Sequence, residues 1–373
     1  MTSSRWQAVR GAAAWSALAL AACAPLPEAP ERPVEAAPLV FPPPPETPRF
    51  VYERTLRGSG DVIREDENSK LRQLLTGEGP KGGEGLGKPY AVTVFQGRVF
   101  VSDTVQRFVS AFDFPNGRFY RIGDEGPGQL AKPHGLDVDG AGNLYVADSS
   151  AKAVVVFDKN GNFLRRIGGE RWFDRLASVT VDPQGDRMYV VDVGGVRSTQ
   201  HRVRVFNPVD GRHLFDFGSR GSGPGEFNFP YDLAVGKDGR LYVVDTGNFR
   251  VQVFDRDGRY LKSFGGAGRQ PGNFARPKEI AADAEGNLYV VDAAFGNFQI
   301  FDPEGALLLY IGQLAEQDAP ARYKLVSGIH VDEDGRVYFV DQWFRKIDVF
   351  RPARLQAGQG YLVNKKKSSE GKK

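Results

Sequence analysis

From residue 88 onward the chain alternates short apolar runs with turns, and one run in each cycle ends in an aspartate. These runs end at Asp103, Asp148, Asp192, Asp245, Asp292 and Asp341, so the spacing is 44 to 53 residues. Five of the aspartates are followed nine residues later by a phenylalanine. In the third copy the gap is 14, because the stretch from Val193 to His201 carries a five-residue insertion. A strand-rich repeat of this length is typical of a β-propeller blade rather than of a helical repeat.

Two sets of glycine turns indicate how many strands each repeat contains. One set precedes the aspartates, at Gly97, Gly142, Gly185, Gly239, Gly286 and Gly335. The other follows the phenylalanines, at Gly117, Gly161, Gly211, Gly258 and Gly305. Such turns supply the positive φ that tight hairpins need. Each repeat is therefore predicted to hold three hairpin-linked strands and a fourth, such as Tyr260 to Phe264.

The sixth repeat stops at Pro352 without a fourth strand, and a matching segment lies at the other end of the chain. Residues 49–58 resemble the fourth-strand segment 258–265, so we expect them to complete the last blade and remove an exposed strand edge. The sequence thus predicts an all-β fold. It is a six-bladed β-propeller of four-stranded antiparallel blades over 49–352, with a closing strand at 49–58 and blades in 88–352.

A long connection, 61–87, separates the closing strand from the first complete blade. Leu71, Leu74 and Leu75 fall on one face of a helix over 66–75, with Gly77 as a stop. The helix is expected at the end of the propeller where the first strand of each blade begins. There it is either a lid over the channel or packed against a blade.

The fourth repeat carries the most specific motif. It reads Phe217-Gly218, then Gly223 to Pro230, then Asp238 to Val251, and these segments resemble the NHL repeat. The third and sixth repeats depart from it, with Leu176 and Val326 where the other four have proline. The resemblance covers most of the chain and implies the propeller fold. The family includes protein- and RNA-binding modules and a few lyases, so it implies no single function.

The N-terminus indicates export. Arg5 and Arg10 precede an apolar run, Gly11 to Ala22, that is too short to span a bilayer, so 1–22 is predicted to be a signal peptide. Leu20-Ala21-Ala22-Cys23 resembles the lipobox of bacterial lipoproteins, which implies cleavage before Cys23 and lipid attachment to its thiol. Ala24, rather than aspartate, is similar to lipoproteins sorted to the outer membrane. We expect a protein lipid-anchored to the bacterial cell envelope, at the outer membrane, facing the periplasm or the surface.

Residues outside the repeats are predicted to be a tether and a tail. Residues 23–48 include ten prolines, a composition that favours an extended spacer, and 353–373 is rich in lysine at its end. The formal charge of +3 comes from these ends, because residues 23–362 sum to −3. A nucleic-acid partner is not expected, since such a protein should carry its positive charge on the folded body. One cysteine excludes a disulfide framework.

Candidate binding residues are predicted on the top face, which we define as the end formed by the loops between blades and by the loops between second and third strands. The aromatic and basic side chains there have the composition of interface hot spots. They are Tyr90, Arg107, His134, Tyr231, Phe249, Arg250, Lys278, Phe295, Trp343, Phe344 and Arg345. For Trp343 and Phe344, which are adjacent on one loop, at least one is expected to be exposed.

Two functions are compatible with these residues. The leading hypothesis is a non-catalytic binding scaffold for an envelope protein or other polymer, without a cofactor. The alternative is a metal-dependent lyase or lactonase with its site in the central channel. Four histidines at different depths give weak support to a zinc site, whereas Asp137, Asp232 and Glu279 on first strands remain possible ligands. The six repeated aspartates are interpreted as structural acceptors of backbone N–H groups.

Overall fold

The computed structural model describes residues 37–63 and 83–362. Residues from Leu39 onward form one compact unit, and the description below concerns that unit. The predicted signal peptide, Cys23, most of the tether and the helix predicted over 66–75 lie outside the described residues. Within them, no helix is long and apolar enough to cross a membrane.

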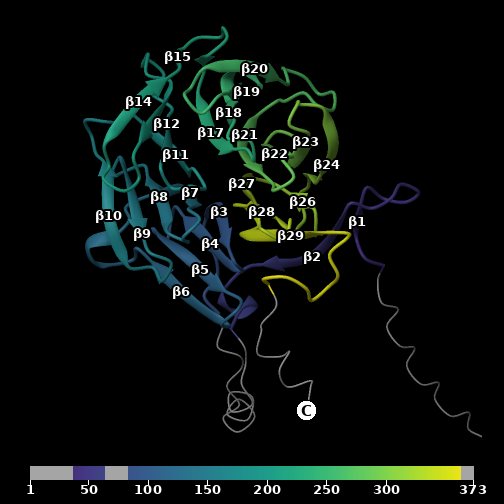
Figure 1. Ribbon diagram of the computed structural model, residues 1–373. Helices are drawn as coiled ribbons and strands as arrows, with labels where there is room; N and C mark the ends of the chain where they lie inside the picture. The colour runs from purple at the N-terminus through teal and green to yellow at the C-terminus, as the bar shows by residue number, and fades with distance from the viewer. Residues whose placement is uncertain (1–36, 64–82, 363–373) are drawn as a thin grey trace, which may run out of the picture. The chain divides into compact units, whose positions relative to one another are not determined.

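Six blades follow one another along the chain, each an antiparallel sheet (Figure 1). The first contains β3 (Pro89–Phe95), β4 (Arg98–Asp103), β5 (Phe108–Asp113) and β6 (Arg118–Ile122); the second β7 (Pro133–Val138), β8 (Leu144–Asp148), β9 (Ala153–Phe157) and β10 (Phe163–Gly168); the third β11 (Leu176–Val181), β12 (Met188–Asp192), β13 (Arg202–Phe206) and β14 (His213–Phe217). The fourth contains β17 (Pro230–Val235), β18 (Leu241–Asp245), β19 (Arg250–Phe254) and β20 (Tyr260–Phe264), and the fifth β21 (Pro277–Ala282), β22 (Leu288–Asp292), β23 (Asn297–Phe301) and β24 (Leu307–Ile311). The sixth contains β27 (Val326–Val331), β28 (Val337–Asp341), β29 (Lys346–Pro352), β2 (Phe50–Leu56) and β1 (Val40–Phe41).

Shorter elements lie in the connections. They are the parallel pairs β15 (Ser219–Arg220) with β16 (Glu226–Phe227) and β25 (Gln313–Leu314) with β26 (Arg322–Tyr323), and the single-turn 3₁₀ helices η1 (Ser59–Asp61), η2 (Gly126–Gly128) and η3 (Thr246–Asn248).

The first strands of the blades form a closed ring around a central channel. Each contacts the first strand of the next blade, in the order β3, β7, β11, β17, β21, β27 and back to β3. Apolar side chains of neighbouring blades pack together between the sheets in six buried clusters. The predicted six-bladed, four-stranded architecture is therefore confirmed.

The N-terminal strand closes the ring. β2 lies beside β29 (Figure 1). The two strands pair antiparallel, from Phe50 opposite Pro352 to Leu56 opposite Ile347. β1 adds a fifth strand outside β2, within the stretch predicted to be tether. It is held because the Phe41 ring packs edge-on against Phe350 at 5.7 Å between centroids.

The C-terminal end of the propeller extends beyond the predicted boundary at 352. Leu362 is buried in the cluster between the sixth and first blades. The N–H of Tyr361 donates to Asp334 Oδ2 at 2.6 Å. Residues 353–362 thus pack on the propeller rather than forming part of a solvated tail, and the lysine-rich end begins after them.

The repeated aspartates fasten the start of each blade to its second strand. Asp103 Oδ2 accepts the N–H groups of Gly87 and Lys88 at 2.7 and 2.8 Å, and Oδ1 accepts those of Val105 and Gln106 at 3.0 and 2.9 Å. All six aspartates are fully buried. The structural interpretation of these carboxylates is confirmed, and each also holds the loop that enters its blade.

Candidate functional site at the channel and its mouth

The central channel contains a cavity of about 180 Å³ lined by first strands. Three carboxylates and one histidine face it, namely Asp137, Asp232, Glu279 and His330. First strands are the inner edges of their sheets, so their outward N–H and C=O groups have no partner within the blade. The channel is therefore where polar side chains are needed to satisfy backbone.

Most of these side chains join one blade to the next. The N–H of Val181 donates to Asp137 Oδ2 at 2.9 Å, and the N–H of Ile280 donates to Asp232 Oδ2 at 3.0 Å. Thr180, between them in the ring, donates its hydroxyl to a carbonyl of the fourth blade at 2.7 Å. Side chains on successive first strands thus substitute for the missing strand-to-strand hydrogen bonds.

Burial changes the protonation of the channel groups. It raises the pKa of Asp137 to about 7 and that of Asp232 to about 6, and it raises the pKa of Glu279 well above its ordinary value. Burial lowers the pKa of His330 to about 4. A carboxyl group with a pKa near neutrality can donate or accept a proton near pH 7. A general acid or base in the channel would need this property.

The histidines lie apart from one another in the described residues. His134 stacks on Tyr90, and His330 lies in the channel. His201, in the insertion of the third blade, is fully buried and accepts the N–H of Phe229 at 3.1 Å. His213 pairs with Asp216 on an outer strand. In the described ranges no three His, Cys, Asp or Glu side chains are grouped as a metal site would need.

Two tyrosines meet across the mouth of the channel. The hydroxyl of Tyr90, on the first blade, forms a hydrogen bond with that of Tyr231, on the fourth. The His134 ring stacks on Tyr90 with centroids 4.5 Å apart and planes at 11°. Lys278 Nζ lies 6.0 Å from the centre of the Tyr231 ring. Four of the predicted top-face residues therefore come together in one cluster, which we call the mouth cluster.

The other predicted residues are spread over separate loops. Arg250 forms an ion pair with Asp245 at 3.0 Å and also donates to two backbone carbonyls, so its guanidinium is used to hold a loop. Phe249 packs partly against the core, Phe295 is half-buried, and Arg107 and Arg345 are exposed.

Trp343 is the most exposed aromatic candidate. Its side chain is 59% accessible, and Lys324 Nζ lies over the indole ring at 4.8 Å from its centre. Phe344 is half-buried, with Lys346 Nζ at 5.9 Å from its ring. The expectation that at least one of the two adjacent aromatic side chains is exposed is confirmed.

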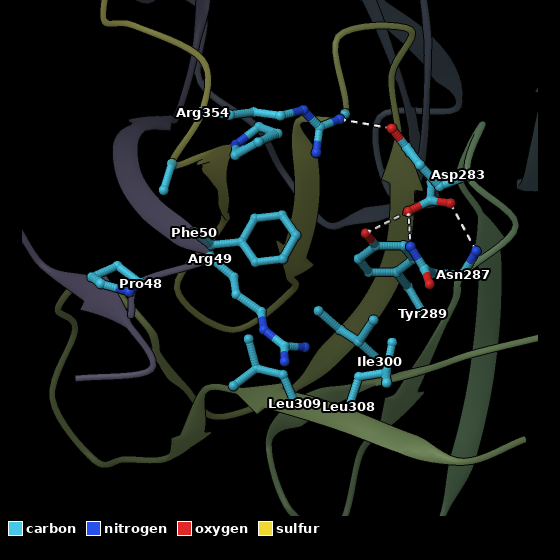
Figure 2. Close-up of a pocket in the computed structure, with 14 residues that line it drawn as sticks. Pro48, Arg49, Phe50, Asp283, Asn287, Tyr289, Ile300, Leu308, Leu309 and Arg354 are labelled. Atoms are coloured by element: carbon cyan, nitrogen blue, oxygen red, sulfur yellow. Dashed lines mark hydrogen bonds and ion pairs between the residues drawn. The ribbon is translucent and has the colours of Figure 1, made fainter. Parts of the chain in front are cut away.

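A second cavity, of about 290 Å³, lies on the opposite end of the propeller, beside the ring closure. Figure 2 shows Phe50 and Arg49 of the closing segment facing Ile300 and Leu309 of the fifth blade across it. In other blades a hairpin glycine fits against the preceding blade, as Gly305 does against Phe264.

The sixth blade has no such hairpin, because its third and fourth strands come from opposite ends of the chain. The cavity lies where these two ends of the chain meet, between 48–50, 352–354 and the fifth blade. This cavity was not predicted from the sequence. The sequence feature that could have indicated it is the absence of a turn glycine after the third strand of the sixth blade.

The fold and the channel define the class of this protein as a six-bladed β-propeller. A model of the NHL repeat matches residues 130–157 and 227–254, in the second and fourth blades. The mouse NHL repeat-containing protein 3 is 31% identical over 140 residues, which cover 33% of this chain and 39% of the mouse protein. Two of the six blades therefore match the NHL repeat, and the chain aligns with well under half the length of this curated relative.

Two solved enzyme structures share the fold. A streptogramin B lyase superimposes with a TM-score of 0.53 and 16% identity, covering 71% of this chain and 94% of the lyase. A gluconolactonase from Xanthomonas campestris superimposes with a TM-score of 0.55 and 17% identity, covering 81% of this chain and 98% of the lactonase. Identities this low establish a common architecture and no more.

Proposed function

We propose that this protein is a binding module of the bacterial cell envelope that recognises a protein or other polymer through its top face. The observation that carries the proposal is the exposed Trp343 with Lys324 stacked on it, beside Arg345 on the same loop. Trp343 offers a large contact area and the exposed Arg345 offers charge-assisted hydrogen bonds, whereas Lys324 is paired with Glu316 and supports the indole ring.

The channel chemistry supports the same proposal. Asp137 and Asp232 each accept a backbone N–H from a neighbouring blade, and the tyrosine pair lies across the mouth above them. These hydrogen bonds join neighbouring blades, and the raised pKa values of the two carboxyl groups follow from burial. The loops of the top face then offer the accessible surface.

Site-specific photo-crosslinking in intact cells tests this proposal. A benzoylphenylalanine replaces Trp343 in one variant, and Val209 on a bottom-face hairpin, which is 67% exposed, in the control variant. We expect a discrete crosslinked species from position 343 that is absent from position 209. Equal crosslinking from both positions, or crosslinking from 209 alone, would contradict recognition through the top face.

The anchor is a separate part of the proposal and has its own test. Cys23→Ser removes the thiol that would carry the lipid, so the variant should leave the membrane fraction while melting at the same temperature as the wild type. A Cys23→Ser variant that stays membrane-bound would show that the anchor assignment is wrong.

A metal-dependent lyase or lactonase is the second candidate. The shared architecture with a streptogramin B lyase and a gluconolactonase favours it, and so do the carboxyl groups of raised pKa in the channel. Adding zinc or calcium to the purified chain and following the melting temperature discriminates between the two. A rise that Asp232→Asn abolishes would favour the enzyme, and an unchanged melting temperature would favour the binding module.

A further inference from the structure

Four blades place a basic residue at the same position, immediately before the first strand. These residues are Lys88, Lys132, Arg175 and Arg276. In each, the backbone N–H donates to the repeated aspartate of its own blade, at 2.8, 3.1, 2.9 and 3.1 Å respectively. The backbone of all four is thus fixed at the entrance to the channel, and we call them the basic collar.

The collar side chains are exposed and have no acidic partner. In the described part of the chain none of the four forms an ion pair or a side-chain hydrogen bond. Arginines of the bottom hairpins behave differently, because Arg240 and Arg256 each form ion pairs with carboxylates there. Cations without a carboxylate partner on the loops around one opening make the local potential positive, which favours the binding of an anion there.

The charges of the basic collar influence the pKa values of two residues in the mouth cluster. The pKa of His134 falls to about 4, first through burial and then through the charges of Lys132, Arg175 and Lys278. The pKa of Lys278 is also lowered, chiefly by burial; the neighbouring Glu279 opposes the shift, and the charges of Arg276 and Lys88 add to it. The four collar charges therefore bear on one region rather than on four separate ones.

Two buried polar groups beneath the collar are short of partners. Lys278 is 9% exposed, and its ammonium group, which has three donors, makes one long contact of 3.4 Å to the carbonyl of Val326. The hydroxyl of Ser327 is fully buried with no hydrogen-bond partner in the described residues. Donors left in this state indicate a site for an acceptor.

Charge is also divided between the two ends of the propeller. Lys and Arg outnumber Asp and Glu in the described loops of the top face, whereas acidic residues outnumber basic ones in the hairpins of the bottom face. The negative formal charge of the folded body thus conceals a basic top face. Such a division steers anions toward the channel mouth.

We propose that the channel mouth binds a phosphoryl group, as a tetrahedral dianion, with the basic collar around it and the tyrosine pair beneath it. Arg175 and Arg276 can each present a planar fork to two oxygens, and the lysines supply point charges on the other side. A dianion suits this arrangement better than a carboxylate, because four cations without an ion pair among the described residues stand on the loops around the mouth. This inference rests on the proposed function, since it names the chemistry that the top face would recognise.

Calorimetry with inorganic phosphate tests the inference on the purified full chain at low ionic strength. We expect saturable 1:1 binding, competition by sulfate, and no competition by acetate at the same concentration. Arg175→Ala and Arg276→Ala should each raise Kd about tenfold or more, as loss of a charge-assisted hydrogen bond does. Lys237→Ala removes an exposed lysine of a bottom hairpin that forms no ion pair with the described residues, and it should leave Kd unchanged.

Two further arms distinguish the source of the phosphoryl group. Glycerol 3-phosphate represents a soluble ester, and vesicles of phosphatidylglycerol in phosphatidylcholine, compared with phosphatidylcholine alone, represent a lipid headgroup. If the protein binds glycerol 3-phosphate or the phosphatidylglycerol vesicles, Arg276→Ala should weaken that binding and Lys237→Ala should not. This result would support the proposal, and the ligand that binds would identify the source of the phosphoryl group.

Absence of saturable phosphate binding, or equal Kd values for collar and control variants, would overturn the inference. The proposed function would survive that result if crosslinking from position 343 persisted. Loss of both phosphate binding and crosslinking would overturn both proposals.

Discussion

Replacing Asp232 by asparagine should stabilise the protein at neutral pH and not at acidic pH. This carboxyl is 8% exposed, and burial raises its pKa from 3.8 to about 6. The folded protein therefore keeps the proton up to about pH 6, whereas the unfolded chain loses it near pH 4. Between these values the folded state binds more protons, so the free energy of unfolding falls as the pH rises.

The size of the effect follows from the two pKa values. At about 1.4 kcal/mol for each pKa unit, the difference between 3.8 and about 6 amounts to about 3 kcal/mol. Wild type bears this cost fully above pH 6. An asparagine keeps an oxygen for the N–H of Ile280, which donates at 3.0 Å to the present carboxylate, and carries no charge at any pH.

Chemical denaturation at pH 4 and at pH 7 measures the prediction. The difference in unfolding free energy between Asp232→Asn and wild type should move in favour of the variant by up to about 3 kcal/mol between these pH values. Asp124→Asn, at an exposed position of the top face, is the matched control and should show a much smaller change. If Asp232→Asn differs from wild type by the same amount at both pH values, the argument from burial is wrong.

Three further changes test the packing of the ring. Arg336→Met should lower the free energy of unfolding by about 3–5 kcal/mol, because it leaves Glu53 buried without the guanidinium 2.8 Å away, and adding Glu53→Gln should restore part of the loss in denaturant titrations. Gly305→Ala should lower the melting temperature more than Gly239→Ala. Both glycines have positive φ, but only at 305 would the new methyl group meet a side chain, at 2.6 Å. Equal melting temperatures of the two variants would refute the packing argument. Tyr231→Phe removes the hydroxyl contact across the channel and should cost about 1 kcal/mol in the same titrations, whereas an unchanged midpoint would count against that contact.

Much of the fold could be predicted because the information is local and repeated. An apolar run ending in aspartate and a glycine turn are each specified within a few residues, and six copies make the register unmistakable. Ring closure could also be predicted, since residues 49–58 supply the strand that the sixth blade lacks. β1 could not, because Val40 and Phe41 form a two-residue strand whose support is a contact with the distant Phe350.

Some features of the candidate site could likewise be predicted from the sequence, and others could not. Tyr90, His134, Tyr231 and Lys278 were predicted to lie near the channel mouth from their common position in the repeat. The hydroxyl contact between Tyr90 and Tyr231 was not predictable, since it joins opposite blades and depends on the width of the channel. The basic collar did have a sequence signal, one basic residue before each of four first strands, but an overall negative body charge concealed it.

The closing strand also determines when the ring can form during synthesis. β2 is made long before its partner β29: Thr55 Oγ1 donates to Asp348 Oδ1 at 2.6 Å, and these residues are 293 positions apart in the sequence. Until β29 has been made, β2 lacks this neighbour and its edge is open to pairing with other chains. A nascent chain that stalls before residue 346 cannot complete its sixth blade, so the ring closes only after all five complete blades have been synthesised.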